Sequence, residues 1–420
     1  MDFVPRPAPS SMLSILRLSA FWGVLLVSLL VLPGCQPEGA SSAFPTRLEV
    51  PASSTSGQPH LSAEDDGTVW VSWIERMETG QHALRYATRT DTSWSEPRTV
   101  AHGGDWFVNW ADVPSLRPLP NDRLAAHYLR SNGSSSLAYQ VRITQTTASG
   151  TWRPAVTPHD DETETEHGFV SLLPWPENKL LAVWLDGREM AGQEGHQGEM
   201  TLRGAVLDSA GTVEDRAMLD ERTCECCPTS AVRVGDEALV AYRDRSKNEI
   251  RNIRLTRFDG RSWSAPTRLH DDDWQIAGCP VNGPALAARG HRVAAAWYTA
   301  PDGRTRVNVA FSDDGGREFS APVVVAEGTP TGRVDVVLLE SGAAVVSWMG
   351  QSDDTAALLL RSVRPDGTLG SPVTMTKLAS ASRGVGMPRL VRSEGHLYAA
   401  WTRPEKGGVQ MGRLPVDAFR

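Results

Sequence analysis

The sequence lacks long helical periodicity after residue 35, has few aromatic residues and carries no excess of basic charge. Its net charge is −8, and aromatic side chains make up 7% of the 420 residues. An acidic chain offers no electrostatic attraction for a phosphate backbone, so we expect no nucleic acid among its partners. The missing 3.6-residue period argues against long helices and coiled coils, whereas 37 Gly and 28 Pro indicate many turns.

The one long apolar run lies near the N-terminus, from Leu18 to Leu32. It follows Arg6 and Arg17 and is shorter than the roughly 20 residues that cross a bilayer, so it is typical of a signal peptide. It ends in Leu32-Pro33-Gly34-Cys35, which resembles the lipobox of bacterial lipoproteins. That resemblance implies that Cys35 carries lipid; the alternative is a plain secretory signal cut nearby.

The N-terminal features predict three segments. Residues 1–34 form the lipoprotein signal peptide, residues 35–45 a polar tether, and residues 46–420 the folded domain. We therefore expect the protein in the bacterial cell envelope, in the outer membrane or periplasm, attached to the membrane through its N-terminal lipid.

One pattern recurs seven times: a short apolar strand follows a turn and ends in an aromatic residue. Neighbouring aromatic positions are 51 to 58 residues apart, which leaves room for four strands in each unit. The spacing predicts an all-β fold, a β-propeller of four-stranded blades, seven in number, with six blades and an irregular unit as the alternative. The aromatic positions are Trp73, Tyr128, Trp184, Tyr242, Trp297, Trp348 and Trp401.

The two ends of the domain complement one another. The last unit, from about Arg383, has room for only three strands, and a lone strand at Thr46 to Val50 precedes the first unit. We expect the N-terminal strand to complete the last blade, because a ring closed in this way leaves no open sheet edge.

A motif in the fifth unit links the chain to a known family. Residues 312–319 read Ser-Asp-Asp-Gly-Gly-Arg-Glu-Phe, and eroded copies lie at residues 90–97 and 258–266. The motif resembles the Asp-box of the sialidase superfamily. The resemblance implies that Ser312 and Asp314 hold the turn, that Gly315 permits its backbone, and that Phe319 plugs the blade.

The chain also departs from that family. Sialidases have six blades, an Arg-Ile-Pro motif and a Tyr nucleophile paired with Glu. Here the count is seven, Arg47-Leu48-Glu49-Val50-Pro51 is only a loose echo, and no Tyr takes the nucleophile's role by motif. The resemblance thus implies the fold more firmly than the activity.

The repeat assigns polar residues to the face where inner strands begin and second strands end. Arg side chains and carboxylates there suit an anionic sugar, because an Arg fork binds a carboxylate through two hydrogen bonds. The alternative is that each is an inter-blade ion pair or a turn cap. The candidates for ligand binding are Asp186, Arg188, Asp244, Arg245, Arg333, Asp335 and His167.

The acidic stretch from His159 to His167 joins the second and third units. Its carboxylates could bind Ca²⁺, and the alternative is a solvated connector.

Four cysteines remain after Cys35, and they open the inner strands of the fourth and fifth units. Outside the cytoplasm an even number indicates disulfides, whose connectivity the sequence leaves open. The alternatives are a soft metal held by three thiolates with His167 or a fourth thiolate, and free thiols. We expect disulfides and neither a metal nor another cofactor. The four residues are Cys224, Cys226, Cys227 and Cys279.

Two classes of function follow. One is an envelope-anchored, sialidase-like propeller that binds an anionic glycan and, if it is an enzyme, hydrolyses it as an exo-α-sialidase does. The other is a non-catalytic propeller that binds a partner protein or a metal at the cell envelope. The catalytic residues stay open in both cases.

Overall fold

The computed structural model describes residues 44–419, apart from residues 91, 193–197 and 353–354. The expected signal peptide, Cys35 and most of the tether fall outside this range. Within the described residues no helix has both the length and the apolar character needed to cross a membrane.

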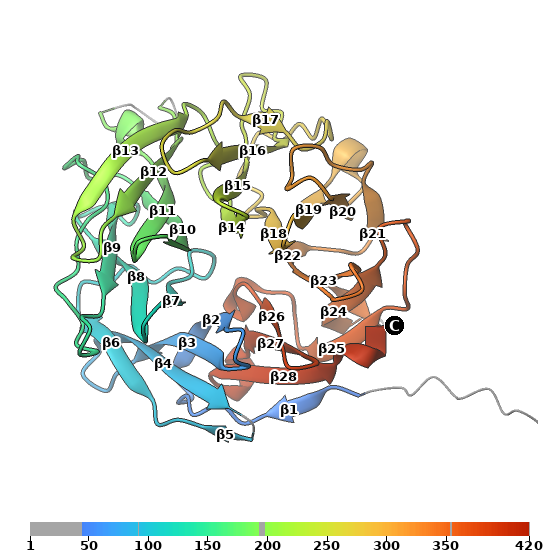
Figure 1. Ribbon diagram of the computed structural model, residues 1–420, viewed down its shortest axis with the longest axis horizontal. Helices are drawn as coiled ribbons and strands as arrows, with labels where there is room; N and C mark the ends of the chain where they lie inside the picture. The colour runs from blue at the N-terminus through green and yellow to red at the C-terminus, as the bar shows by residue number, and fades with distance from the viewer. Residues whose placement is uncertain (1–43, 91, 193–197, 353–354, 420) are drawn as a thin grey trace, which may run out of the picture. The chain divides into compact units, whose positions relative to one another are not determined.

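The domain is a ring of seven antiparallel sheets around a central channel (Figure 1). In each sheet the chain runs from the innermost strand outwards, so the first strands line the channel. The first blade contains β2 (Ser56–Ala63), β3 (Val69–Arg76), β4 (His82–Thr90), β5 (Ser93–Trp94) and β6 (Arg98–Gly103). The second blade contains β7 (Ser115–Leu119), β8 (Arg123–Ser131) and β9 (Tyr139–Gln145). The third blade contains β10 (His167–Trp175), β11 (Lys179–Asp186), β12 (Thr201–Leu207) and β13 (Val213–Asp220). The fourth and fifth contain β14 (Ser230–Val234), β15 (Glu237–Arg243), β16 (Ile253–Phe258) and β17 (Thr267–Arg268); and β18 (Ala285–Arg289), β19 (Arg292–Thr299), β20 (Arg306–Ser312) and β21 (Val323–Glu327). The last two contain β22 (Gly332–Leu338), β23 (Ala344–Ser352), β24 (Thr355–Val363) and β25 (Val373–Leu378); and β26 (Arg389–Ser393), β27 (His396–Thr402) and β28 (Val409–Pro415).

The ring closes as the sequence predicts. The strand β1 (Thr46–Leu48) pairs antiparallel with β28 and supplies the outer strand of the last blade, as Figure 1 shows beside the C-terminal segments. Seven blades are therefore confirmed and the six-bladed alternative is wrong. The second blade has the weakest outer edge, because only isolated bridges, including Ile143 with Val156, continue its sheet.

The recurrent aromatic residues lie where the repeat predicts, on the second strand of every blade. Trp73 and Trp297 are fully buried, and Trp184 is 1% exposed. Each fills space between neighbouring sheets that face each other at an angle. Truncating such a side chain to Ala typically costs about 3–5 kcal/mol, so these positions stabilise the ring strongly.

Three inner strands begin with a bulge whose central residue has a left-handed backbone. Gln58, Phe169 and Arg333 have φ values of 54°, 53° and 54°. At the third blade, the carboxylate of Asp112 accepts the Phe169 N–H at 2.8 Å. A Cβ on Gly168 would lie 2.0 Å from Asp112 Oδ2, so only glycine fits beside this carboxylate.

Hydrogen bonds from backbone N–H groups to side chains stabilise the turn between β20 and β21. Asp314 Oδ1 accepts the N–H of Arg317 at 2.9 Å, and Ser312 Oγ accepts the N–H of Gly316 at 2.7 Å. Gly315 and Gly316 both have positive φ, of 80° and 78°. The turn therefore needs both glycines.

Candidate functional site

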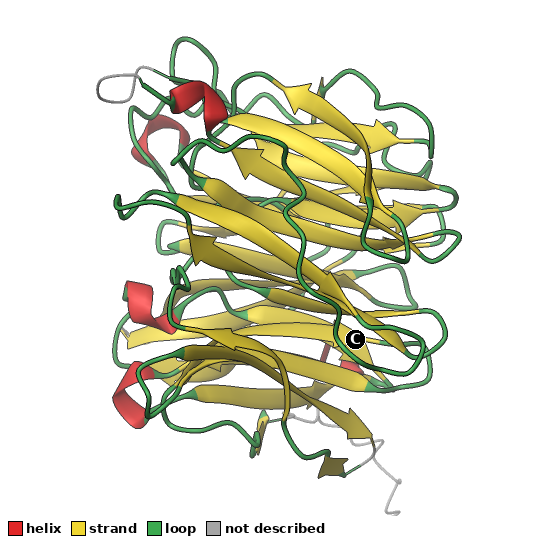
Figure 2. Ribbon diagram, turned by 90° about the vertical axis from the view of Figure 1, so that its left-hand side faces the viewer, coloured by secondary structure: helices red, strands yellow, loops and turns green. Residues whose placement is uncertain are grey.

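The two faces of the ring differ in construction. We call the face where inner strands begin and second strands end the entry face, and the opposite one the turn face. Four short 3₁₀ helices follow second strands or precede an inner strand, and so belong to the entry face; Figure 2 shows short helices gathered on one side of the ring. They are η1 (Arg188–Met190), η2 (Pro301–Gly303), η3 (Arg383–Val385) and η4 (Pro404–Lys406), whereas η5 (Val416–Phe419) follows β28.

Asp186 and Arg188 form a closed ion-pair cluster at the end of β11. Asp186 is fully buried and accepts the Trp184 Nε1–H at 2.8 Å. Arg188 donates to both oxygens of Asp186 and also pairs with Asp160 at 2.8 Å and Asp161 at 3.2 Å. Carboxylates of its own blade and of the preceding connector thus satisfy this guanidinium.

Part of the connector from His159 to His167 packs against this cluster, whereas Asp160, Glu162 and Glu164 are exposed. Asp161 binds His159 Nδ1 at 2.9 Å and His167 Nε2 at 3.1 Å, and the two imidazoles stack 4.0 Å apart. Burial lowers the pKa of His167, but hydrogen bonding to Asp161 and the charge of Asp186 raise it more, so its net pKa lies above the ordinary value. The solvated-connector alternative therefore does not describe the buried His159 and His167, but it fits the exposed Glu162 and Glu164.

Two groups of side chains could hold a metal ion, because their ligand atoms lie within 4.8 Å of one another. One contains His159, Asp161 and His167, whose two nitrogens suit a transition metal better than Ca²⁺. The other is the thiol group of the fourth blade.

Asp244 and Arg245 are also paired, but with other partners. Arg245 binds Glu249 at 2.8 Å and Glu225, and Asp244 lies 3.0 Å from Arg254 Nε. Burial raises the pKa of Asp244 to about 6 against the opposing effect of Arg254. The Asp186–Arg188 and Asp244–Arg245 pairs are therefore two separate clusters.

Glu166 lies between these clusters. Its carbonyl accepts the Gly187 N–H at 2.8 Å, and its carboxylate feels the charge of Glu225, the partner of Arg245. Burial, with a smaller contribution from Glu225, raises the pKa of Glu166 to about 7. The sequence analysis missed Glu166, because the repeat pattern does not show that Glu225, from the next blade, lies near it.

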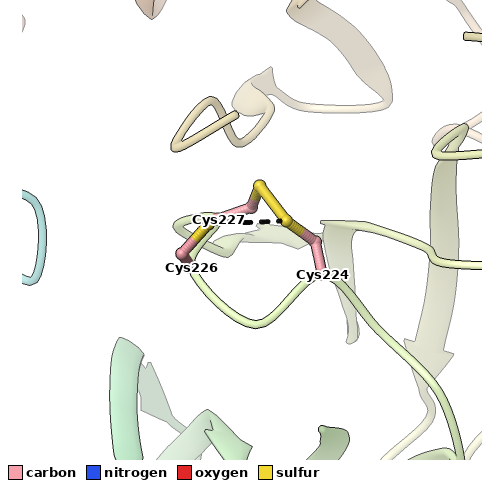
Figure 3. Close-up of side chains that lie close together, drawn as sticks. All are labelled: Cys224, Cys226 and Cys227. Carbon is pink, nitrogen blue, oxygen red and sulfur yellow. Dashed lines mark hydrogen bonds between the residues drawn. A yellow bond between two sulfur atoms is a disulfide. The ribbon is translucent and has the colours of Figure 1, made fainter. Parts of the chain in front are cut away.

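The four cysteines meet on the entry face between the fourth and fifth blades. Disulfides join Cys224 to Cys227 and Cys226 to Cys279, with Cα separations of 5.7 and 6.1 Å. Figure 3 shows the sulfur atoms of Cys224, Cys226 and Cys227 gathered in one tight loop. The second pairing ties two neighbouring blades together.

Arg333 has a positioning role. Its guanidinium lies 4.8 Å from the Trp110 ring centroid and donates to the carbonyls of Ala381, Ser382 and Gly386. Burial lowers its pKa to about 10. Arg333 thus fixes both Trp110 and the loop that carries η3. Asp335, by contrast, lies inside the channel and accepts the N–H of Leu390 at 2.9 Å.

A pocket of about 220 Å³ opens next to Trp110, between the first, second and last blades. Gln58, Arg76 and His82 line it with Trp110. The Gln58 Oε1 atom is buried without a hydrogen-bond partner in the described part of the chain. Burial and the charge of Arg76 lower the pKa of His82, so this imidazole is neutral at pH 7.

Two exposed guanidiniums flank this pocket. Arg76 is part of its wall, and Arg383 lies 6.0 Å from the Trp110 ring centroid. Unlike Arg188 and Arg245, neither has an ion-pair partner among the described residues. Neither arginine, nor Trp110, is among the ligand-binding candidates that the sequence predicts.

Comparison with known proteins shows the architecture alone. No family model and no curated protein matches the sequence. An ulvan lyase bound to -[GlcA(1-4)Rha3S]- is similar over 88% of this chain and 96% of its own, at 11% identity and a TM-score of 0.55. The α-L-arabinanase of Penicillium chrysogenum complexed with arabinobiose is similar over 90% of this chain and 100% of its own, at 10% identity and a TM-score of 0.52. The polysaccharide lyase Uly1 is similar over 91% of this chain and 94% of its own, at 8% identity and a TM-score of 0.53.

These similarities place the chain among β-propellers whose architecture glycan-active enzymes also use. At such low identity the fold is shared and the chemistry is not carried over.

Proposed function

We propose that this protein is an envelope-anchored propeller that binds an acidic glycan in the Trp110 pocket. The observation that carries the proposal is the pair of unpaired guanidiniums, Arg76 and Arg383, beside an aromatic ring and a buried amide oxygen. Everywhere else on the entry face the arginines named above have carboxylate or carbonyl partners.

The pocket's chemistry suits one acidic sugar unit. An Arg fork binds a carboxylate bidentately, the Trp110 ring offers an apolar surface, and Gln58 Oε1 can accept a hydroxyl hydrogen. Neutral His82 can donate to or accept from a second hydroxyl. The ligands named for the similar propellers, a GlcA-containing unit and arabinobiose, support carbohydrate as the ligand class.

Attachment to the envelope rests on the sequence. Bacterial lipidation at Cys35 would supply the two or more acyl chains that stable anchoring needs. The bound partner would then be a surface or periplasmic carbohydrate, or a glycosylated envelope protein.

Calorimetric titration tests the site. We expect glucuronate- or sialate-terminated oligosaccharides to bind and a neutral oligosaccharide of equal length not to bind. Arg76→Met should weaken binding at least tenfold, because a charge-assisted hydrogen bond contributes about 1.5–3 kcal/mol. Trp110→Ala should weaken it similarly, and Arg261→Met, at an exposed site in another blade, is the control. Equal affinity of the Arg76→Met and wild-type proteins would contradict the proposal.

Glycoside hydrolysis of the sialidase type is the second candidate. Glu166, with its pKa raised to about 7 next to Glu225, has the property of a general acid at neutral pH. In the described residues, however, the buried phenol of Tyr242 donates to Asp220 and no Tyr hydroxyl is hydrogen-bonded to Glu. Release of a fluorogenic aglycone from sialosides or uronides, abolished by Glu166→Gln, would establish hydrolysis; no release would leave binding as the function.

A further inference from the structure

The central channel contains two half-buried arginines that lack the partners found for the fully buried Arg243. Arg117 on β7 and Arg389 on β26 line a cavity of about 180 Å³ together with His60. The Nε atoms of both arginines are buried without a hydrogen-bond partner in the part of the chain that the structure describes. No carboxylate of these described residues lies within ion-pairing distance of either guanidinium.

Arg243, by comparison, is a buried arginine whose guanidinium nitrogens all donate hydrogen bonds to the protein. It is 1% exposed, and it donates to the carbonyls of Asn282, Arg251 and Tyr298. Arg117 and Arg389 have no such set of acceptors. Burying an unsatisfied charged group costs several kcal/mol, so an acceptor is expected where none is supplied by the chain.

The charge balance inside the channel is positive. Asp335 is the carboxylate on the cavity wall, and its oxygens already accept the N–H groups of Val336 and Leu390, each at 2.9 Å. Burial and the nearby Arg389 lower the pKa of Arg117 to about 10, which leaves it charged at neutral pH. Two positive charges therefore face one negative charge.

The histidines beside the arginines add no charge. His127 Nδ1 lies 2.8 Å from Ser115 Oγ and 3.3 Å from the Ser115 nitrogen, and its Nε2 is buried without a partner among the described residues. Burial, with smaller contributions from Arg117 and Arg389, lowers the pKa of His127 to about 3. A neutral His60 likewise has Nδ1 without a partner.

We propose that the channel binds one small inorganic oxyanion between Arg117 and Arg389, independently of the glycan pocket. A tetrahedral or planar oxyanion supplies several acceptor atoms and one or two negative charges, which match the unpaired guanidinium donors. The cavity is large enough for such an ion and a few waters, since a water occupies about 30 Å³ in the liquid. Arg117, Leu390 and Val391 line both this cavity and a wide depression of about 740 Å³ on the turn face.

Equilibrium dialysis with labelled sulfate tests the site in the intact protein. We expect about one sulfate retained per chain at millimolar concentration, and at least tenfold weaker retention by Arg117→Met and Arg389→Met. Arg364→Met, which alters an exposed arginine outside the channel, is the control and should retain sulfate as the wild type does. No retention by the wild type, or equal retention by all four proteins, would overturn the proposal.

The effect of sulfate on the melting temperature provides a second test. Sulfate would not change the order of the melting temperatures if the two arginines were only structural. Without sulfate, Arg389→Met should melt at or above the wild type, because one of two repelling charges is gone. With sulfate the order should reverse, and a general salt effect would instead stabilise all the proteins equally. If the Met variants do not fold, competition experiments on the wild type decide the question, with phosphate, acetate or chloride added to the labelled sulfate. Displacement of the sulfate supports a site for small anions. If phosphate does not displace the sulfate, the proposal is overturned.

Discussion

Arg188 holds the buried carboxylate of Asp186 through two parallel hydrogen bonds, from Nε to Oδ1 at 2.8 Å and from Nη2 to Oδ2 at 2.9 Å. This fork is the geometry that would bind a sugar carboxylate, yet a carboxylate of the protein occupies it. In the first blade Arg76, the last residue of β3, lies at the same face of the ring and has no such partner among the described residues.

The first prediction compares these two arginines. Arg188→Ala should lower the free energy of unfolding by about 3–5 kcal/mol, because it removes the bidentate partner of the buried Asp186 and leaves it the longer contacts with His167 at 3.5 Å and Arg203 at 3.7 Å. Its affinity for acidic oligosaccharides should stay unchanged. Arg76→Ala should have the opposite profile, with normal stability and weakened binding. Urea denaturation and calorimetric titration of both variants measure this, and a loss of affinity in Arg188→Ala with unchanged stability would return Arg188 to the ligand site.

The second prediction concerns pH. The pKa of Glu166 is about 7 in the folded protein against an ordinary value of 4.5, so the folded state binds more protons between these values. Stability must therefore fall as pH rises through this window, and the raised pKa of His167 acts in the same direction as its proton is lost.

Replacing Glu166 by Gln should remove much of this pH dependence. We expect Glu166→Gln to be more stable than the wild type at pH 8 by on the order of 1–3 kcal/mol, and nearly equal to it at pH 4, below the ordinary pKa of Glu. Urea denaturation at both pH values measures the difference. An unchanged slope in the variant would show that Glu166 titrates normally.

The third prediction concerns the thiols. The Cys226–Cys279 bridge spans 53 residues and the Cys224–Cys227 bridge only 3. In the chain-entropy description the longer loop contributes about 4 kcal/mol and the shorter about 2 kcal/mol. Cys279→Ser should therefore destabilise the protein more than Cys224→Ser does.

Mass spectrometry of non-reduced digests should link the Cys279 peptide to the peptide that contains Cys226. A chelator-sensitive melting temperature together with four alkylatable thiols would instead identify the group as a metal site.

The fourth prediction concerns the anchor. Cys35→Ser should move the protein from the membrane fraction to the soluble fraction, because it removes the residue that would carry the lipid. Radiolabelled palmitate incorporation should disappear in parallel. Membrane association of the Ser variant at the wild-type level would contradict lipidation at Cys35.

Much of the fold follows from local patterns. The aromatic ends of the second strands, exemplified by Trp184 and Trp297, predicted seven blades because each blade repeats the same strand length and the same packing need. The strand at Thr46 predicted closure, because the last unit lacked one strand and an open edge is unfavourable. The neighbouring positions of Cys226 and Cys279 followed from equivalent places in adjacent repeats.

The site depended on contacts between blades, which a repeat pattern does not contain. Arg76 ends the second strand of the first blade and Arg188 lies two residues beyond that of the third, so the sequence by itself determined their face and not their partners. The connector before the third blade brings Asp160 and Asp161 to Arg188, whereas the described residues around Arg76 bring no carboxylate within ion-pairing distance. Only the tertiary structure decided which guanidinium stays available, because a charge is paired by whichever chain segment packs against it and not by its own place in the repeat.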